Sequence, residues 1–365
     1  MTRRRLEAIT IEGFTSLRSS TVELRDLNVL VGANGAGKSN FVSALAMLGR
    51  IVDGELNLFV GTAGGAGVLL HNGAKGSTRI SLRLDFAPNG YEADLVPSVG
   101  DELIFGRETV LFQGEGYEQP FVLSLGAGHR ETRLTEEVKQ QRAIAGHVTR
   151  VLHGCRVFHF HDTSANAPVK QSGYAADNLT LHPDARNLAA VLLRLRNSSS
   201  PVYQRIVRDV QKVAPFFRDF VLVEQHERLQ LRWKQEGSDT VFPANALSDG
   251  TLRFVCLATL LNLPDLPGLV VLDEPELGLH PYAIVQLADM LRAASQDSQV
   301  VVATQSVTLM DQFALDDLIV VERQDGASTF GRPNPERLQD WLDEYSLGEL
   351  WQKNLLGGRP IPEGG

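Results

Sequence analysis

The sequence predicts an α/β fold in which one large domain carries two insertions. Residues 27–45 run from an apolar strand through a glycine-rich turn into an amphipathic helix, and residues 249–303 alternate helical and strand patterns. Between these segments, residues 51–135 are rich in glycine and short strand patterns, which is typical of an antiparallel β subdomain. Residues 136–213 are mainly helical, which predicts a helical lobe.

Composition places the chain among globular proteins. With 365 residues, 43% of them apolar, it is long enough for one large domain or two lobes that share a core. The two cysteines, Cys155 and Cys256, lie far apart without a CxxC pair, which favours a reducing cytosol over a disulfide framework. Because no apolar run reaches the roughly 18 residues that span a bilayer and no signal pattern opens the chain, we expect a cytoplasmic protein with no membrane partner.

The net charge of -9 argues against a protein that coats nucleic acid, since that function requires a phosphate-neutralising surface. Local basic faces remain, at Arg3–Arg5, on the helix that carries Arg186, Arg194 and Arg196, and on a hairpin with Arg228, Arg232 and Lys234. A solvated face is the favoured interpretation of each one, and DNA remains an alternative partner.

The first half of the chain predicts mainly strands. Strand patterns occupy residues 8–11, 21–24 and 27–31, and those of the β subdomain occupy residues 78–86, 91–96 and 109–113. A second glycine cluster at residues 61–67 lacks the Lys-Ser/Thr ending of a phosphate loop, so we expect a mobile hairpin loop there.

The second half predicts mainly helices. Helical patterns cover residues 136–152, 183–196, 200–213, 249–262 and 281–294, hairpin strands cover 219–223 and 228–233, and buried strands cover 269–272 and 299–303. Pro183 fits the first turn of its helix, and Trp341 and Trp351 are expected to anchor a core. No sustained heptads support a coiled-coil arm. The expected domains are residues 1–165, 166–245 and 246–365.

Residues 32–39 match the pattern GxxxxGK[ST] of a P-loop in full. Glycines allow backbone N–H groups to face phosphates, Lys38 can reach the β- and γ-phosphates, and Ser39 offers a hydroxyl to Mg²⁺ at a helix N-terminus. The sequence therefore predicts a site for ATP and Mg²⁺. Its expected nucleotide-binding residues are Asn34, Gly35, Ala36, Gly37, Lys38, Ser39 and Asn40.

Residues 269–274 form an apolar run that ends in two acids. Ligands bind at the carboxyl ends of the strands in a parallel sheet, so this run predicts a second part of the same site. Asp273 is expected to hold Mg²⁺, directly or through water, and Glu274 to polarise the attacking water as general base.

The stretch LSDGT, residues 247–251, opens the helix that precedes this strand. Here the chain resembles an ABC-type ATPase head of the RecF and SMC kind, whose signature reads LSGGQ; Ser248 and Gly250 match that signature, whereas Asp249 and Thr251 depart from it. The resemblance implies that Ser248, Asp249 and Gly250 bind the γ-phosphate held by an opposite subunit, so that a head-to-tail homodimer encloses two ATP molecules. The alternative is a plain N-capped helix start.

Residues 273–281, DEPELGLHP, resemble the AAA_21 and OLD-like ATPases, and residues 181–196 and 345–360 resemble one group of uncharacterised bacterial predicted ATPases. The implied fold is a P-loop NTPase, specifically an ABC-type head with an inserted antiparallel β subdomain and a helical lobe. OLD-family proteins append a metal-dependent nuclease domain. Only some sixty residues follow Gln305 here, without its acidic motifs, so we expect no nuclease activity.

Gln305 occupies the position of the family's switch histidine. Because of this position, Gln305 is expected to be catalytic. A glutamine can donate a hydrogen bond to a γ-phosphate but carries no charge, so we expect hydrolysis to be slow. The glutamine of the family's lid loop corresponds to Gln113 or to the His159–Asp162 region, and the latter is favoured. His159 and His161 also resemble a metal pair, although a structural or nucleotide-proximal role is favoured because no further ligand cluster accompanies them.

These observations predict a Mg-dependent ATPase, with Lys38, Glu274 and Gln305 as catalytic residues, that drives the opening and closing of a homodimer. The resemblance to OLD-like ATPases implies a regulatory or sensor role in antiviral defence or genome maintenance, with a separately encoded effector. A RecF-like DNA repair ATPase is the alternative, and a transporter ATPase subunit is disfavoured by the β subdomain. Adenine contacts are expected near Thr15–Arg18.

Overall fold

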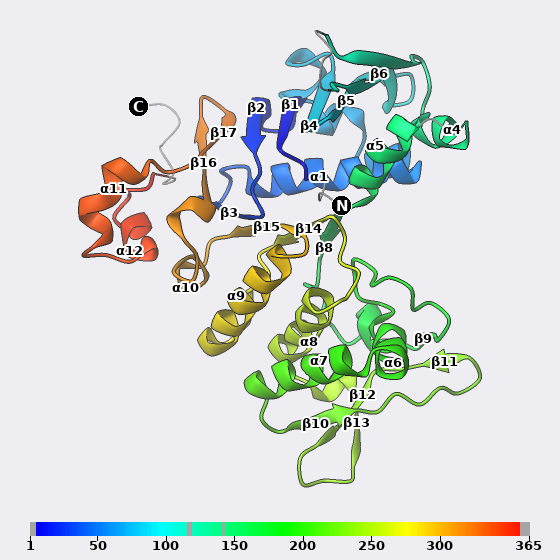
Figure 1. The fold of residues 1–365 in the computed structure, drawn as a ribbon, viewed down its shortest axis with the longest axis vertical. Helices are drawn as coiled ribbons and strands as arrows, with labels where there is room; N and C mark the ends of the chain where they lie inside the picture. Colours follow the sequence, from blue (N-terminus) through cyan, green and yellow to red (C-terminus); the bar gives the residue numbers. More distant parts are fainter. Residues whose placement is uncertain (1–4, 115–118, 141–142, 358–365) are drawn as a thin grey trace.

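The computed structural model describes residues 5–114, 119–140 and 143–357. Two six-stranded sheets, one mainly parallel and one antiparallel, lie on either side of helix α1 (Lys38–Asp53), and a helical lobe extends from the far side of the mainly parallel sheet (Figure 1). One core cluster joins α1 to both sheets through residues such as Ile9, Phe41 and Val271, and another joins the opposite face of the mainly parallel sheet to the helical lobe. The predicted α/β class is confirmed.

The central sheet has the strand order β17-β16-β3-β15-β14-β8. Its strands are β3 (Leu27–Val31), β8 (Cys155–Phe158), β14 (Leu269–Asp273), β15 (Gln299–Thr304), β16 (Leu318–Gln324) and β17 (Ala327–Gly331). All neighbours are parallel except β17, which pairs antiparallel with β16. Every residue of β3 and β15 is buried, which explains their continuous apolar runs.

The second sheet is antiparallel and has the order β2-β1-β4-β5-β6-β7. It comprises β1 (Ala8–Phe14), β2 (Leu17–Glu23), β4 (Ile80–Phe86), β5 (Asn89–Ser98), β6 (Glu102–Phe112) and β7 (Phe121–Gly126). The predicted strand at residues 109–113 is only the end of β6, and β7 was not anticipated.

The glycine cluster at residues 61–67 does not form the expected hairpin loop. It lies across the end of α2 (Leu56–Thr62) and the start of α3 (Ala66–Leu69), and the 3-10 turn η1 (Gly73–Lys75) follows. Leu56 and Val60, four residues apart, bury one face of α2 and so favour a helix in spite of the glycines.

Two further helix boundaries differ from the expectation. The segment expected as a single helix at 136–152 contains α4 (Leu134–Lys139) and α5 (Ala143–His153); residues 141–142 lie outside the described residues. Helix α6 (Leu188–Ser198) begins five residues after Pro183, because the Asn187 side chain stabilises a preceding turn. Its Nδ2 donates to the carbonyls of Asp177 and Thr180, and its Oδ1 accepts from the His182 N–H.

The helical lobe contains α6, α7 (Ser200–Val213) and α8 (Asp249–Leu261). Small sheets complete it: β10 (Phe217–Phe220), β12 (Arg232–Gln235) and β13 (Val241–Pro243) form one, β9 (Gly173–Tyr174) and β11 (Arg228–Leu229) the other. The other elements are three 3-10 turns and four helices. The turns are η2 (Pro168–Lys170), η3 (Ala244–Ala246) and η4 (Leu315–Asp317), and the helices are α9 (Pro281–Ser295), α10 (Val307–Met310), α11 (Pro335–Leu342) and α12 (Leu347–Gln352).

The two C-terminal tryptophans differ in burial. Trp351 is partly buried against the core cluster that joins the central sheet to the helical lobe, as expected, whereas Trp341 is 42% exposed and lies beside Tyr345 with ring centroids 5.9 Å apart. The expectation that Trp341 anchors a core is therefore wrong, because α11 presents that face to solvent.

Candidate nucleotide site

The parallel strands of the central sheet bring the predicted site together at one edge. The P-loop follows β3, His159 follows β8, Asp273 ends β14, and Gln305 follows β15. Asp273 is in register with Ala303, and Ala303 is in register with Leu30 of the strand that leads into the P-loop. Residues that are far apart in the sequence therefore line the carboxyl edge of the sheet, as the strand assignment predicted.

The P-loop ends in α1, which begins at Lys38. Gly35 and Gly37 adopt φ values of 77° and 112°, which disfavour residues with a Cβ. The Lys38 ammonium group donates to the carbonyls of Gly32 at 2.7 Å and Ala33 at 3.1 Å. Burial lowers the pKa of Lys38, whereas the carboxylates of Glu274, Asp273 and Glu276 oppose that change. The lysine thus lies folded over its own loop and close to the acids.

The remaining predicted P-loop residues differ in accessibility. Asn34, Gly35 and Ser39 are exposed, as groups that contact a nucleotide or its metal require, whereas Ala36 and Gly37 are buried. The Asn40 side chain points away from the exposed part of the loop and donates to the Ser16 hydroxyl at 2.7 Å. Asn40 therefore supports the loop through its side chain.

Asp273 and Glu274 occupy different environments. Within the described residues, Asp273 Oδ1 is buried without a hydrogen-bond partner, and a buried carboxylate oxygen of this kind suits a Mg²⁺ ion or one of its waters. Glu274 adopts a φ of 45°, and its N–H donates to the Ala303 carbonyl at 2.8 Å. Its Oε1 accepts from Gln305 Nε2 at 2.6 Å. The predicted base and the predicted switch residue are therefore in direct contact.

Glu276 is a third acid at this edge, and sequence reasoning gave it no role. It is buried, the Thr304 hydroxyl donates to it, and its burial raises its pKa. Thr304 Oγ1 also accepts from the N–H of Ser306, at 2.9 Å. The pair connects the loop after β14 to the loop after β15. The sequence feature that could have pointed to Glu276 is its partner Thr304, a polar residue that ends an apolar strand directly before Gln305.

Ser248 caps α8, since its hydroxyl accepts from the Thr251 N–H at 3.2 Å. Ser248 and Asp249 are exposed, and Gly250 packs against the loop that follows the acids. A Cβ at Gly250 would come within 2.5 Å of the Gly278 carbonyl oxygen. The signature residues therefore lie beside residue 278 and present an open helix N-terminus to solvent.

Arg253, which sequence reasoning missed, ties α8 to the loop after β8. Its side chain is buried and donates to the carbonyls of Phe160 at 3.0 Å and His161 at 3.2 Å. Desolvation lowers its pKa. Only its position five residues after Ser248 could have drawn attention to it, because a charged residue facing a core has no sequence signature.

The favoured lid region, His159–Asp162, lies beside the acids. Desolvation and the neighbouring His161 lower the pKa of His159, and the carboxylate of Asp273 opposes that change. Gln113, the other candidate, follows β6 in the antiparallel sheet. In the described part of the chain, no group of three or more His, Cys, Asp or Glu residues is arranged to hold a metal.

A P-loop, an acid-ended strand and a capped helix around one parallel sheet define an ATPase head of the ABC type. A family model described as "AAA domain, putative AbiEii toxin, Type IV TA system" (AAA_21) matches residues 27–119 and 141–311. The chain belongs to this family.

Solved structures with the same fold include SMC heads. A head bound to the C-winged helix domain of ScpA shares 17% identity and a TM-score of 0.54, covering 92% of this chain and 99% of that one. A head with an extended coiled coil from Pyrococcus furiosus, bound to the C-terminal domain of ScpA, shares 17% identity at a TM-score of 0.53, covering 93% and 99%. A head with a coiled coil and joint from Pyrococcus yayanosii shares 15% identity at a TM-score of 0.50, and the match covers 93% of this chain and 99% of that one.

No curated protein matches the sequence. None of the helices in the described residues combines the length and the apolar character needed to cross a membrane.

Proposed function

We propose that this protein is a Mg-dependent ATPase that closes as a head-to-tail homodimer around ATP and opens after hydrolysis. The observation that supports it best is the meeting of Lys38, Asp273, Glu274 and Gln305 at one edge of the central sheet. A phosphate cradle, a carboxylate suited to a metal and a second carboxylate with an oriented partner are the parts that phosphoryl transfer to water requires.

In this proposal residues 34–40 form the cradle, and Lys38 turns from its own loop carbonyls toward the β- and γ-phosphates. Ser39 and the unpartnered oxygen of Asp273 would hold Mg²⁺. When bound, the ion would neutralise charge that develops on the phosphate oxygens. The fit depends on the cradle glycines and on that buried oxygen.

Glu274 would accept a proton from the attacking water, and Gln305 would orient the Glu274 carboxylate. The amide of Gln305 already donates one of its two N–H groups to Glu274, so the other N–H is the one that a γ-phosphate could accept. Because the amide carries no charge, it stabilises a developing anion less than a charged donor would. This weaker stabilisation supports the expectation of slow turnover.

The signature residues would complete the site in trans. Ser248, Asp249 and Gly250 open a 13-residue helix, and helix N-termini bind phosphate. Leu277 and Tyr282 are each 52% exposed. Leu277 directly precedes Gly278, the residue that contacts Gly250, and Tyr282 lies four residues after Gly278. A pair of exposed apolar residues next to an open helix start supports burial of this surface in a homodimer.

We further propose a regulatory or sensor role with a separately encoded effector, in antiviral defence or genome maintenance. The family description names a toxin of a type IV toxin–antitoxin system, which supports a defence role. Two of the similar SMC heads are bound to domains of another protein, ScpA, which supports the expectation of a protein partner.

The test is light scattering of the Glu274→Gln variant with and without Mg-ATP, together with phosphate release by the wild-type protein. We expect an ATP-dependent doubling of mass in the variant and loss of hydrolysis, since ATP binding persists when the base is removed. Lys38→Ala is the control that should neither bind ATP nor dimerise. A wild-type protein that neither binds ATP nor releases phosphate would contradict the proposal.

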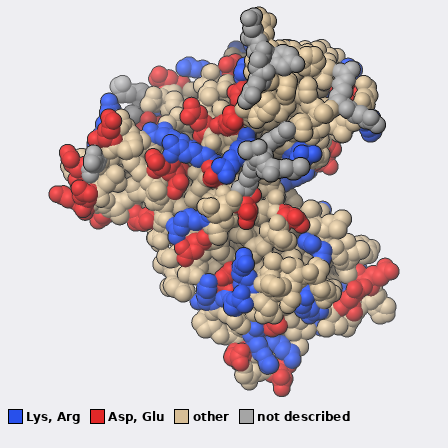
Figure 2. Space-filling view, viewed as in Figure 1, with Lys and Arg blue, Asp and Glu red and all other residues tan. Residues whose placement is uncertain are grey.

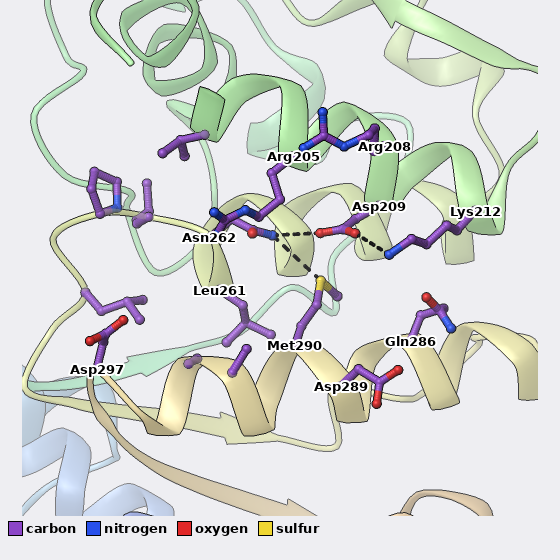
Figure 3. Close-up of a pocket in the computed structure, with 16 residues that line it drawn as sticks. Arg205, Arg208, Asp209, Lys212, Leu261, Asn262, Gln286, Asp289, Met290 and Asp297 are labelled. Carbon is purple, nitrogen blue, oxygen red and sulfur yellow. Dashed lines mark hydrogen bonds and ion pairs between the residues drawn. The ribbon is translucent and has the colours of Figure 1, made fainter. Parts of the chain in front are cut away.

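A RecF-like DNA-binding function is the second candidate, because the helical lobe is locally basic. Residues 166–245 contain eleven Lys and Arg against eight Asp and Glu, a net +3, whereas the whole chain has a net charge of -9. Lys and Arg side chains gather on the visible face of this lobe (Figure 2). Arg205, Arg208 and Lys212 project from α7 beside a groove of about 510 Å³ that α9 lines on its other side (Figure 3). Asp209, Asp289 and Asp297 line the same groove.

A further inference from the structure

A continuous chain of hydrogen bonds across the base of the P-loop links Asn40, Ser16, Ser328 and Ala36. The Asn40 amide donates to Ser16 Oγ at 2.7 Å, the hydroxyls of Ser16 and Ser328 lie 2.6 Å apart, and Ser328 Oγ donates to the Ala36 carbonyl at 2.6 Å. The chain begins on the first turn of α1 and ends within the P-loop, so it closes a ring across the base of the loop.

The chain has one consistent direction. A serine hydroxyl has a single proton, and a carbonyl oxygen only accepts. Because Ser328 gives its proton to Ala36, Ser16 must donate to Ser328, and the Ser16 oxygen is then free to accept from Asn40. Every member is satisfied in this arrangement. A buried polar chain of this kind is rigid, since any rotated hydroxyl would lose a hydrogen bond.

Packing fixes the two serines in place. Ser16 is 6% exposed and Ser328 is 2% exposed. The Ser328 N–H donates to the Ser16 carbonyl at 2.8 Å, and Ser20 Oγ donates to the Ser328 carbonyl at 3.1 Å. A Cβ on Gly37 would overlap Ser328 Oγ and would lie 2.8 Å from Ser16 Oγ. Gly37 is therefore required for this close approach as well as for its positive φ.

The anchored carbonyl determines where the next amide points. In a trans peptide the C=O and the following N–H point in opposite directions. With the Ala36 carbonyl turned back to Ser328, the N–H of Gly37 faces the other side of the loop, where the phosphates of a nucleotide would lie.

We propose that Ser328, supported by Ser16, is a positioning residue that aims the Gly37 amide at the phosphates. The inference rests on the proposed ATPase function, and it assigns residues of the β16–β17 hairpin to nucleotide affinity. Both side chains are buried behind the loop, so we assign neither a contact with the nucleotide, and Ser16 is not one of the adenine contacts expected near Thr15–Arg18. Ser328 acts through Ala36 and Gly37, and Ser16 acts through Ser328.

The test is Ser328→Ala, with Mg-ATP and Mg-ADP dissociation constants, KM and kcat measured beside the unfolding temperature without nucleotide. We expect both dissociation constants and KM to rise about fivefold to tenfold, the effect of one misdirected hydrogen bond. We expect kcat to change less than about twofold, because Glu274 and Gln305 are untouched. An effect on ADP as well as ATP distinguishes the cradle from a group that contacts only the γ-phosphate.

Ser20→Ala is the matched control, since Ser20 is buried at 8% exposure and bonds the Ser328 backbone but not the P-loop. It should lower the unfolding temperature and leave both dissociation constants unchanged. Ser16→Ala should give a smaller rise than Ser328→Ala, because the bond to Ala36 survives. Wild-type affinity in Ser328→Ala, or an equal rise in Ser20→Ala, would overturn the inference. Failure of the wild-type protein to bind nucleotide would instead overturn the proposed function.

Discussion

Glu274 and Gln305 show how a local backbone distortion serves the proposed chemistry. A left-handed φ such as the 45° of Glu274 costs a residue with a Cβ about 1–2 kcal/mol. The parallel register with β15 enforces it, because the Glu274 N–H is held by the Ala303 carbonyl. The distortion places the carboxylate 2.6 Å from the Gln305 amide. An uncharged donor beside the base is consistent with an ATPase that turns over slowly.

Replacing Gln305 by histidine tests the effect of charge at this position. An imidazolium donor stabilises an anionic transition state better than an amide, so we expect Gln305→His to raise kcat about tenfold. The gain should be largest at pH 6 and fade by pH 8, because an imidazole with an ordinary pKa of about 6.5 loses its proton over that range. Initial phosphate-release rates from pH 6 to 8 measure it. Equal rates in both proteins across this range would show that charge at residue 305 is irrelevant.

The burial of Glu276 predicts a pH-dependent stability difference. Its pKa is raised in the folded protein, so the charged form is disfavoured at neutral pH, and the penalty vanishes as pH falls below the unfolded pKa. We expect Glu276→Gln to increase the free energy of unfolding by about 1 kcal/mol at pH 7, with the gain shrinking toward pH 5. Urea titrations at both pH values provide the measurement. The exposed Glu224, which lies in a loop outside any helix, gives the control, since Glu224→Gln should change stability at neither pH.

At the scale of elements, the contact between α8 and the loop after β14 links the helical lobe directly to the edge of the central sheet that carries the candidate nucleotide site. Gly250 allows the helix start to touch the Gly278 backbone, and Arg253 extends the same helix to residues 160–161. The helix that we propose to present its N-terminus to a partner subunit is therefore anchored to two loops beside its own candidate nucleotide site. Movement of either loop would change the orientation of the signature.

Alanine substitutions at two helical glycines test this packing. Gly250→Ala places a Cβ 2.5 Å from the Gly278 carbonyl oxygen and should destabilise the protein by about 1–3 kcal/mol. Gly146, in α5, has open space around its Cβ position, so Gly146→Ala should stabilise by up to about 1 kcal/mol. Chemical denaturation of both variants gives the comparison. The packing argument would be wrong if the two substitutions shifted stability in the same direction.

Sequence patterns predicted the elements that have strong local signals. The apolar runs of β3, β14 and β15 and the GxxxxGK[ST] match led to the correct edge of the correct sheet. The helix over the glycine cluster was missed because two buried residues, Leu56 and Val60, outweigh the propensity of glycine. Ser328 lies 312 positions from Ser16 and has no motif of its own, so only the tertiary structure brings it to the P-loop.

For the whole molecule, the segregation of charge sets the expectation for DNA. With the lobe at +3 within a chain of net -9, the rest has a net -12 and would repel a polyanion. Any DNA contact should therefore use the helical lobe. Arg205 and Arg208 are exposed and form no ion pair with any residue in the described ranges, which leaves both free to meet phosphates.

The double variant Arg205→Glu with Arg208→Glu tests that expectation. If the protein binds DNA, fluorescence anisotropy at low salt should show at least a tenfold loss of affinity and a shallower salt dependence. Lys75→Glu with Lys139→Glu changes the net charge equally and lies outside the helical lobe, so it should have a much smaller effect. Equal losses in both double variants would indicate a general charge effect and no DNA surface on α7.

The position of β3 between β15 and β16 has a consequence during synthesis on the ribosome. The strand that leads into the P-loop is translated within the first 31 residues, yet both of its partners come after residue 298. Until β15 and β16 have been translated, the apolar strand β3 has no strand to pair with. Exposed apolar strands of this kind make nascent chains prone to aggregation and dependent on chaperones. A prematurely released chain would lack the strands on both sides of β3, so its P-loop would have no sheet to hold it in place.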